Sequence, residues 1–255
     1  MVTKFWHYAE VDLPLIIQFL LCPVVLLSLL AVTAPYGRHH QPGWGPSLPS
    51  RAAWFLMELP ALLVIAWLVL DHPARTAAVA WVPLAFWLVH YSYRTLLFPA
   101  LMRPSGKTFP ALLVLFAIGF NVLNGFNNAN ALIANAASGK SLLTPHFLAG
   151  TLVFWTGFAI HCHADHVIRT LRKPGERAYK IPEGGLFRKV SSPHYLGEIL
   201  QWAGWAILTW SLAGLAFALF TFCNLAPRAI SNHRWYRRRF ADYPERRKVL
   251  VPGIF

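Results

Sequence analysis

The feature that most constrains this chain is a series of apolar runs, each long enough to cross a lipid bilayer. A membrane-spanning helix needs about 20 consecutive, predominantly apolar residues. The composition agrees, since 56% of the 255 residues are hydrophobic and only 13% are charged, outside the usual range of a soluble domain. We therefore predict an all-α integral membrane protein with seven transmembrane helices. We expect them near residues 13–33, 53–71, 78–100, 109–133, 145–168, 194–210 and 211–230, the last two separated only around Thr209, Trp210 and Ser211.

The basic residues predict how these helices are oriented. The net charge is +13, and 20 of the 23 Lys and Arg fall on one side of a seven-helix arrangement whose N-terminus is outside. By the positive-inside rule, this places the C-terminus in the cytoplasm. The charge thus indicates topology rather than a nucleic-acid partner. The first apolar run follows Glu10 and Asp12 instead of a basic segment, so we expect no cleavable signal peptide there.

Glu58 lies inside the second apolar run, in the stretch RAAWFLMELPALLV. An ionisable residue in a transmembrane helix costs roughly 2.5–3.5 kcal/mol and is a functional hypothesis by default; the alternative is a carboxylate near enough to the interface to reach water or an arginine. His90, Tyr91, Tyr93 and Arg94 end the third run on the same membrane side. If Tyr91 lies near Glu58, the phenol can donate a hydrogen bond or a proton to a substrate oxygen.

The fourth apolar run carries an unusual number of amide side chains. So many amides in a bilayer helix imply either hydrogen bonds between helices or a polar, partly wet cavity, and we slightly favour the cavity. The residues are Asn121, Asn124, Asn127, Asn128, Asn130 and Asn135.

The stretch IHCHADH at 160–166 resembles the HxHxDH pattern of dinuclear zinc hydrolases, but it closes an apolar helix instead of following a strand. Helical residues two apart point about 200° from each other, which splits the cluster, so we expect no metal site. His161 and Asp165 are predicted to share a face with Arg169 and Arg172. That face is suited to a polar, phosphate-bearing ligand.

Two basic segments, the loop at 170–195 and the tail at 228–255, mix arginines with aromatic residues. Guanidinium groups bind phosphates and rings stack on bases, although anionic lipid headgroups also suit such a segment. The chain has no GxGxxG or Walker pattern, so we predict no Rossmann domain. Any nucleotide site would be assembled from helix ends and loops, with the loop as a cap and Gly184 and Gly185 allowing it to move.

Several ordered motifs resemble the steroid 5α-reductase family over almost the whole chain, and its type 2 branch in particular. They are RAAWFLMELP, HYSYRT, LRKPGERAYKIPEGGLF, YLGEILQW and HRWYRRRFADYPERRKVLVPGIF. The resemblance implies a seven-helix membrane enzyme that uses NADPH to reduce the Δ4 double bond of a 3-oxo-4-ene steroid. Glu58 and Tyr91 match the catalytic pair that hydrogen-bonds the C3 carbonyl, with the donors aimed at an oxygen that gains charge. Trp54 and Trp202 would complete the substrate site.

The resemblance also implies a single domain, with residues 1–105 on the substrate side and residues 106–255 holding the cofactor. Lys107, Lys180, His161, His194 and Asn232 depart from the residues usual in the family but keep hydrogen-bonding capacity. Met57 and Asn224 are further departures, and they leave the preferred steroid open. The implied cofactor-binding residues are Lys107, His161, Asp165, Arg172, Tyr179, Lys180, His194, Glu198, Arg228, Asn232 and Tyr236.

Three other functions stay open at this point: a membrane methyltransferase that uses S-adenosylmethionine, another sterol or enone-lipid reductase, and a non-enzymatic lipid-binding protein. The methyltransferase would have no use for Glu58 together with Tyr91. The expected partners are a steroid that arrives through the bilayer and membrane lipid, with no obligate protein partner. The expected location is the bacterial inner membrane or the endoplasmic reticulum membrane, as a multi-pass protein.

Overall fold

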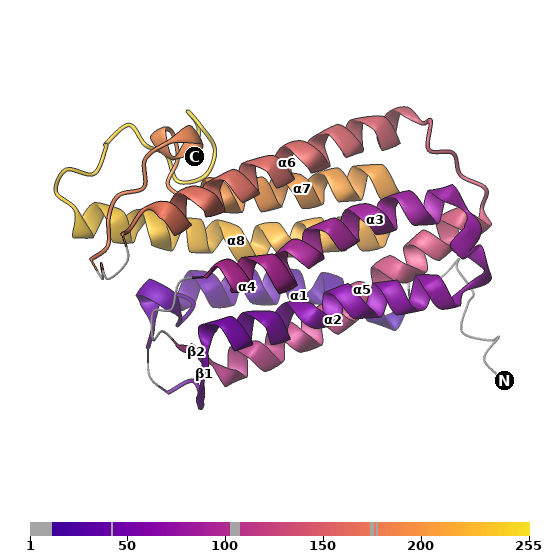
Figure 1. The fold of residues 1–255 in the computed structure, drawn as a ribbon, viewed down its shortest axis with the longest axis horizontal. Coiled ribbons are helices and arrows are strands. Elements are labelled where there is room, and N and C mark those ends of the chain that lie inside the picture. Colours follow the sequence, from indigo (N-terminus) through magenta and orange to yellow (C-terminus); the bar gives the residue numbers. More distant parts are fainter. Residues whose placement is uncertain (1–11, 42, 103–107, 174–175, 177) are drawn as a thin grey trace.

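Long helices that run side by side along one axis make up most of the molecule (Figure 1). The computed structural model describes the chain except residues 1–11, 42, 103–107, 174–175 and 177. A π-helical turn and three short 3-10 turns interrupt or join the helices. The helices are α1 (Leu13–Ala31), α2 (Ser50–Asp71), α3 (Ala78–Ser92), α4 (Phe98–Leu101), α5 (Ala111–Ala137), α6 (Pro145–Thr170), α7 (Pro193–Thr209) and α8 (Leu212–Arg239); the π turn is Tyr93–Leu97, and the 3-10 turns are Gly37–His39, Pro73–Thr76 and Gly185–Arg188.

Each of the seven apolar runs contains a long helix, as the sequence predicts. Among the described residues, five helices are long and apolar enough to cross a membrane by length and composition: α1, α2, α5, α6 and α8. The other two are shorter as regular α-helix, with 15 residues in α3 and 17 in α7. The chain is therefore a largely helical, multi-pass membrane protein. Seven spans and the orientation of the termini stay predictions.

The break between α7 and α8 lies at the predicted position. α7 ends at Thr209, and Trp210 takes a left-handed conformation with φ 45°. The Ser211 hydroxyl then accepts a hydrogen bond from the Gly214 backbone N–H at 3.0 Å and so caps the first turn of α8. A capping serine satisfies one of the free N–H groups at a helix start.

Helices α6 and α7 lie in direct backbone contact through four glycines. Gly150 and Gly157 on α6 face Gly204 and Gly197 on α7, and a methyl group at any of the four would overlap the backbone of the opposite helix. Small residues at such positions let membrane helices approach closely. This contact fixes the side chains of α7 against those of α6 at the level of His161.

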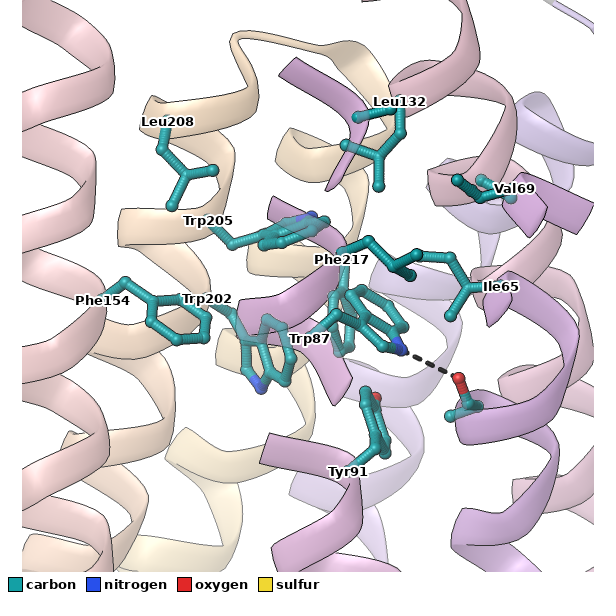
Figure 2. Close-up of a cluster of buried hydrophobic side chains, with 14 of the residues drawn as sticks. Ile65, Val69, Trp87, Tyr91, Leu132, Phe154, Trp202, Trp205, Leu208 and Phe217 are labelled. Carbon is teal, nitrogen blue, oxygen red and sulfur yellow. Dashed lines mark hydrogen bonds between the residues drawn. The ribbon is translucent and has the colours of Figure 1, made fainter. Parts of the chain in front are cut away.

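An aromatic cluster fills the centre of the bundle (Figure 2). The Trp87 indole is fully buried and donates a hydrogen bond to the Ala61 carbonyl at 2.8 Å, which ties α3 to α2. Its ring packs against Trp202 and Trp205 of α7 at centroid distances of 5.3 and 5.1 Å. A buried indole needs such a partner, because an unpaired N–H in an apolar core is costly.

The asparagines of α5 form hydrogen bonds with neighbouring helices. Asn121 donates to the Met57 carbonyl of α2 at 2.6 Å, Asn127 to the Gln18 side chain of α1 at 2.7 Å, and Asn135 to the Thr209 carbonyl at the end of α7 at 2.7 Å. These bonds support the first alternative, hydrogen bonds between helices, and not the polar, partly wet cavity that we slightly favoured.

The loop after α6 and the C-terminal tail pack against each other and against the end of α8 (Figure 1). Val190 forms an isolated parallel bridge with Lys248, and Arg247 donates to the Pro182 carbonyl at 3.1 Å. Ser191 lies within hydrogen-bonding distance of His233 of α8, at 2.6 Å. The described part of the loop is thus folded onto the helix ends. A two-stranded antiparallel sheet, β1 (Ser47–Pro49) with β2 (Thr108–Pro110), joins the starts of α2 and α5.

Candidate active site

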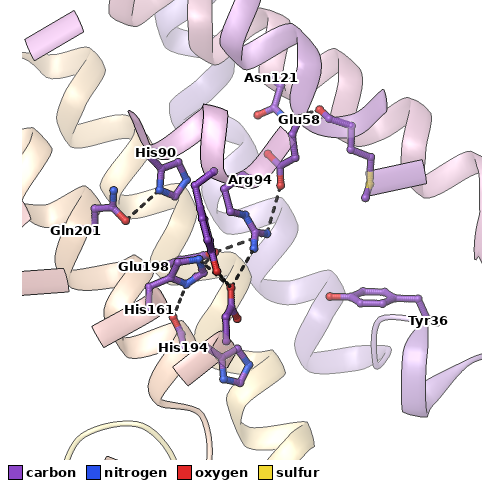
Figure 3. A network of polar contacts seen from close by, with 12 residues as sticks. Tyr36, Glu58, His90, Arg94, Asn121, His161, His194, Glu198 and Gln201 are labelled. Carbon is purple, nitrogen blue, oxygen red and sulfur yellow. Dashed lines mark hydrogen bonds and ion pairs between the residues drawn. The ribbon is translucent and has the colours of Figure 1, made fainter. Parts of the chain in front are cut away.

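The Arg94 guanidinium lies among three carboxylates inside the bundle (Figure 3). It is 3.3 Å from Glu58 of α2, 3.7 Å from Glu198 of α7 and 3.9 Å from Asp165 of α6. Arg94 itself is only 8% exposed. Buried charges are tolerated when they are paired, and here one cation connects three helices through their acidic groups.

His161 joins the same group of charges, which we call the carboxylate network: Glu58, Arg94, His161, Asp165 and Glu198. Its Nε2 lies 3.3 Å from Asp165 and its Nδ1 lies 3.4 Å from Glu198. The Tyr93 hydroxyl donates to Asp165 at 3.2 Å. The network is thus continuous from α2 to α7.

Local structure explains why these side chains meet. Arg94 lies in the π turn that follows α3, a wide turn that is frequent at functional sites. His161 and Asp165 are one helical turn apart, so they share a face of α6. Glu198 follows Gly197, whose backbone lies against that of His161, and the helix contact brings the carboxylate to the imidazole.

Tyr91 is buried in the aromatic cluster, three residues before Arg94. Its ring lies 5.8 Å from Trp202 and 4.9 Å from Trp87. Among the described residues no hydrogen bond joins Tyr91 to Glu58, whose carboxylate accepts from Arg94, although the two groups are close enough to interact electrostatically. The carboxylate of the predicted pair is therefore held by Arg94, and its role with Tyr91 stays a prediction.

A second site, the basic pocket, lies between the end of α1, the loop after α6 and the end of α8. Its cavity measures about 220 Å³. His39 contacts the Asn232 side chain at 3.3 Å, and burial lowers the pKa of this imidazole. Thirteen residues line the cavity: Thr33, Ala34, Tyr36, Gly37, Arg38, His39, Arg172, Tyr179, His194, Tyr195, Arg228, Ser231 and Asn232.

Two arginine donors that line this pocket, Arg38 Nη1 and Arg228 Nε, have no hydrogen-bond partner among the described residues. His194 Nδ1, which can donate or accept depending on the tautomer, has no partner among them either. The Arg38 guanidinium also stacks on the rings of Trp235 and Tyr236, at 4.9 and 4.6 Å. Buried donors without partners are costly, so the pocket is suited to a ligand rich in acceptor oxygens.

The two sites meet at His194. Its carbonyl oxygen lies 3.3 Å from His161 Nδ1, and its ring lines the basic pocket. A ligand in the basic pocket therefore lies next to the carboxylate network.

The predicted cofactor residues divide between these sites. Arg172, Tyr179, His194, Arg228 and Asn232 line the basic pocket. His161, Asp165 and Glu198 belong to the carboxylate network, and Tyr236 lies under Arg38. Of the predicted substrate residues, Trp54 stacks on the Arg94 guanidinium at 4.6 Å, and Trp202 packs beside Tyr91.

Other sequence predictions fit less well or lie outside the described residues. Lys180 forms a surface ion pair with Glu176 at 2.6 Å and does not line the basic pocket, and its hydrogen bond lowers the pKa of Glu176. The Arg169 side chain contacts His166 at 3.1 Å and does not pair with Asp165 among the described contacts. Lys107 lies outside the described residues.

Sequence reasoning missed the two central arginines, Arg94 and Arg38. Arg94 was noted at the end of the third apolar run without a role of its own, and Arg38 was counted only among the topology charges. A signal for Arg94 is its position three residues after Tyr91, on nearly the same helical face. No comparable signal marks Arg38, because it reaches the pocket from the segment between α1 and α2, and that segment was assigned to the substrate side.

No group of three or more His, Cys, Asp or Glu residues that could hold a metal ion occurs in the described part of the chain. In the stretch at 160–166, His163 lies against Gly185 of the loop, and His161 and Asp165 face Arg94. The stretch thus contributes an imidazole and a carboxylate to the carboxylate network.

Comparison with known proteins gives the family. The family model described as 3-oxo-5-alpha-steroid 4-dehydrogenase matches residues 107–255. The chain is 41% identical to 3-oxo-5-alpha-steroid 4-dehydrogenase 1 of Macaca fascicularis, over 94% of this chain and 93% of the relative. It is 43% identical to the type 1 enzyme of Homo sapiens, over 86% of each chain. It is also 41% identical to the type 2 enzyme of Macaca fascicularis, over 90% of this chain and 91% of the relative.

These matches confirm the resemblance to the family, but they do not favour its type 2 branch, because type 1 and type 2 relatives match at nearly the same identity. The matched region holds the basic loop, the tail, Asp165 and Glu198. The relatives align over nearly the full length, which includes Glu58 and Arg94. The chain belongs to the 3-oxo-5-alpha-steroid 4-dehydrogenase family and is an oxidoreductase that acts on CH–CH bonds.

Proposed function

We propose that this protein uses NADPH to reduce the Δ4 double bond of 3-oxo-4-ene steroids of the testosterone or progesterone type to 5α-dihydrosteroids. The observation that carries the proposal is the direct contact between the basic pocket and the carboxylate network, through His194 and His161. This contact supports a cofactor that is anchored in the pocket and reaches toward Glu58 and Tyr91. The family relationship supplies the reaction class.

The residues of the basic pocket fit a phosphate-rich nicotinamide cofactor. Arg38, Arg172 and Arg228 offer guanidinium groups for phosphates, and donors on Arg38 and Arg228 are left without partners among the described residues. Tyr179 offers a ring for stacking. At about 220 Å³ the cavity is smaller than a typical small-molecule site of at least roughly 300 Å³, so it suits the phosphate-bearing part of the cofactor.

When bound, NADPH supplies the hydride that reaches C5 of the steroid. The chain's own residues act at the other end of the enone. The Tyr91 hydroxyl donates a hydrogen bond to the C3 carbonyl oxygen, which gains negative charge as the hydride arrives. Glu58, oriented by Arg94, completes this oxygen site, and C4 then takes up a proton. Trp54 and Trp202 supply apolar surface for the steroid rings, and water is excluded because the site lies inside the helix bundle.

We also propose how the helices are oriented in the membrane. Seven helices cross the membrane, with the N-terminus outside and the basic loop and tail in the cytoplasm. The steroid enters from the bilayer, and NADPH enters from the aqueous side at the ends of α6 and α8. This arrangement separates the two entry routes.

The test uses membranes that contain the full chain, incubated with NADPH and with testosterone or progesterone, and measures the 5α-dihydro product. Wild-type protein should form it, and Tyr91→Phe and Glu58→Gln should lower its rate of formation by about 100-fold or more. Arg172→Ala should raise the NADPH concentration required far more than the steroid concentration, whereas Arg169→Ala, a surface control on the same helix end, should change neither.

Two results would contradict the proposal. If the wild-type protein forms no product under any of these conditions, the proposed class of steroid substrates is wrong. Full activity of Tyr91→Phe would leave the family assignment intact and remove the proposed role of the phenol.

A further inference from the structure

A chain of buried amides connects helices α1, α5 and α7. Trp205 of α7 donates from its indole N–H to Asn128 Oδ1 at 2.7 Å. Asn128 Nδ2 in turn donates to Asn124 Oδ1 at 2.9 Å, and Gln18 Nε2 of α1 donates to the same oxygen at 2.9 Å. All of these side chains are almost completely buried.

The orientation of each amide follows from the indole, which can only donate a hydrogen bond. Because Trp205 donates, the atom of Asn128 that faces it must be the oxygen. The NH₂ group of Asn128 then faces Asn124, so the Asn124 atom that it contacts must also be an oxygen. The NH₂ group of Asn124 is therefore forced to point away from Asn128 and Gln18, and a flipped Asn124 would set three NH₂ groups against one another.

This forced NH₂ group has no hydrogen-bond partner among the described residues, although Asn124 is fully buried. The Asn124 side chain interacts with Tyr91 of the neighbouring helix α3. An unpaired buried donor is costly, and the phenol oxygen can accept a hydrogen bond. The amide group that lacks a partner thus belongs to the residue that interacts with the proposed catalytic tyrosine.

We propose that Asn124 is a positioning residue for Tyr91: its amide donates a hydrogen bond to the phenol oxygen, and the phenolic proton is left to point at the ligand's carbonyl oxygen. A tyrosine hydroxyl that accepts from the protein has its one proton free to donate elsewhere. An accepted hydrogen bond also polarises the O–H group and strengthens the bond that it donates.

The inference rests on the proposed function for its consequence in catalysis, but the hydrogen bond can be tested without any substrate. Protein labelled with ¹³Cζ-tyrosine gives an NMR signal for each tyrosine, and the loss of one signal in Tyr91→Phe assigns Tyr91. Asn124→Leu should shift the Tyr91 signal. Asn135→Leu is the matched control, since it removes another buried amide of α5, one that donates to the Thr209 carbonyl, and it should leave the Tyr91 signal in place.

A second variant guards against misfolding of Asn124→Leu. Trp205→Phe keeps an aromatic ring but removes the donor that orients the chain, so it should shift the Tyr91 signal in the same direction by a smaller amount. Unchanged positions of the other seven tyrosine signals serve as the test of folding for every variant.

In the turnover assay, Asn124→Leu should lower kcat by about tenfold, the effect of one ordinary hydrogen bond, and should leave the NADPH requirement unchanged. An unshifted Tyr91 signal in both Asn124→Leu and Trp205→Phe would overturn the inference. If Asn124→Leu shifts the Tyr91 signal but the wild-type protein reduces no steroid, the proposed function is refuted and the hydrogen bond between Asn124 and Tyr91 still stands.

Discussion

Replacing Arg94 by methionine removes a cation that contacts all three carboxylates of the network. Its guanidinium lies 3.3 to 3.9 Å from Glu58, Glu198 and Asp165. At an effective dielectric constant of about 20, each attraction amounts to about 4–5 kcal/mol. Desolvation and repulsion among the carboxylates offset most of that sum, and removing one partner of a buried ion pair typically costs about 3–5 kcal/mol. We expect Arg94→Met to lower the free energy of unfolding by that amount.

Methionine is chosen because its unbranched side chain keeps much of the arginine stem, so that the packing on Trp54 and Phe98 is lost only in part. The free energy of unfolding can be measured by titration of mixed micelles with a denaturing detergent, with the fluorescence of the 11 tryptophans as the signal. Arg169→Met is the control, since Arg169 makes a surface contact with His166, and it should cost less than about 1 kcal/mol.

A double variant separates charge from packing. If uncompensated carboxylates cause the loss, Glu58→Gln should cost less stability in the Arg94→Met background than in wild type, or should even restore some. A loss below about 1 kcal/mol for Arg94→Met, or an effect of Glu58→Gln that is equal in both backgrounds, would refute the view that Arg94 holds the three helices together through charge.

The other predictions concern the helix contact and pH. Gly157→Ala should destabilise the protein by about 1–3 kcal/mol and separate His161 from Glu198, because the added methyl group overlaps the α7 backbone; Gly119→Ala, which meets open space on α5, should be neutral or slightly stabilising in the same detergent titration. Because burial lowers the pKa of His39, the unfolded chain takes up that proton first and stability falls as the pH drops below about 6.5. His39→Gln should show a smaller loss between roughly pH 8 and pH 5, and an unchanged loss would contradict this assignment.

The positions of the helices and the residues of the sites were readable from the sequence to different degrees. Apolar runs predicted where the helices lie, and even the break at Trp210 was correct, because a transmembrane helix depends on its own local hydropathy. Glu58 was found because a carboxylate is conspicuous among apolar residues. Arg172 and Arg228 were found through the resemblance to the family, and both line the basic pocket.

Residues whose role depends on the rotation and pairing of helices were not readable in this way. Arg94 and Arg38 look like ordinary topology charges, yet the structure buries Arg94 among carboxylates and places Arg38 in the basic pocket. Lys180, which the resemblance assigns to the cofactor, pairs with Glu176 at the surface, and its role stays a prediction. A one-dimensional charge pattern does not say which partner a long side chain meets.

The sequence by itself determined that this is a multi-pass helical membrane protein, and its motifs indicated the family, because hydropathy and motif spacing are local properties of the chain. Only the tertiary structure decided that Glu58, Asp165 and Glu198 converge on Arg94, that the α5 amides bond between helices, and that His194 links the two sites. The physical reason is that these contacts join residues 33 to 109 positions apart. They form only when close backbone packing, as between the glycines of α6 and α7, fixes how each helix is rotated against the next.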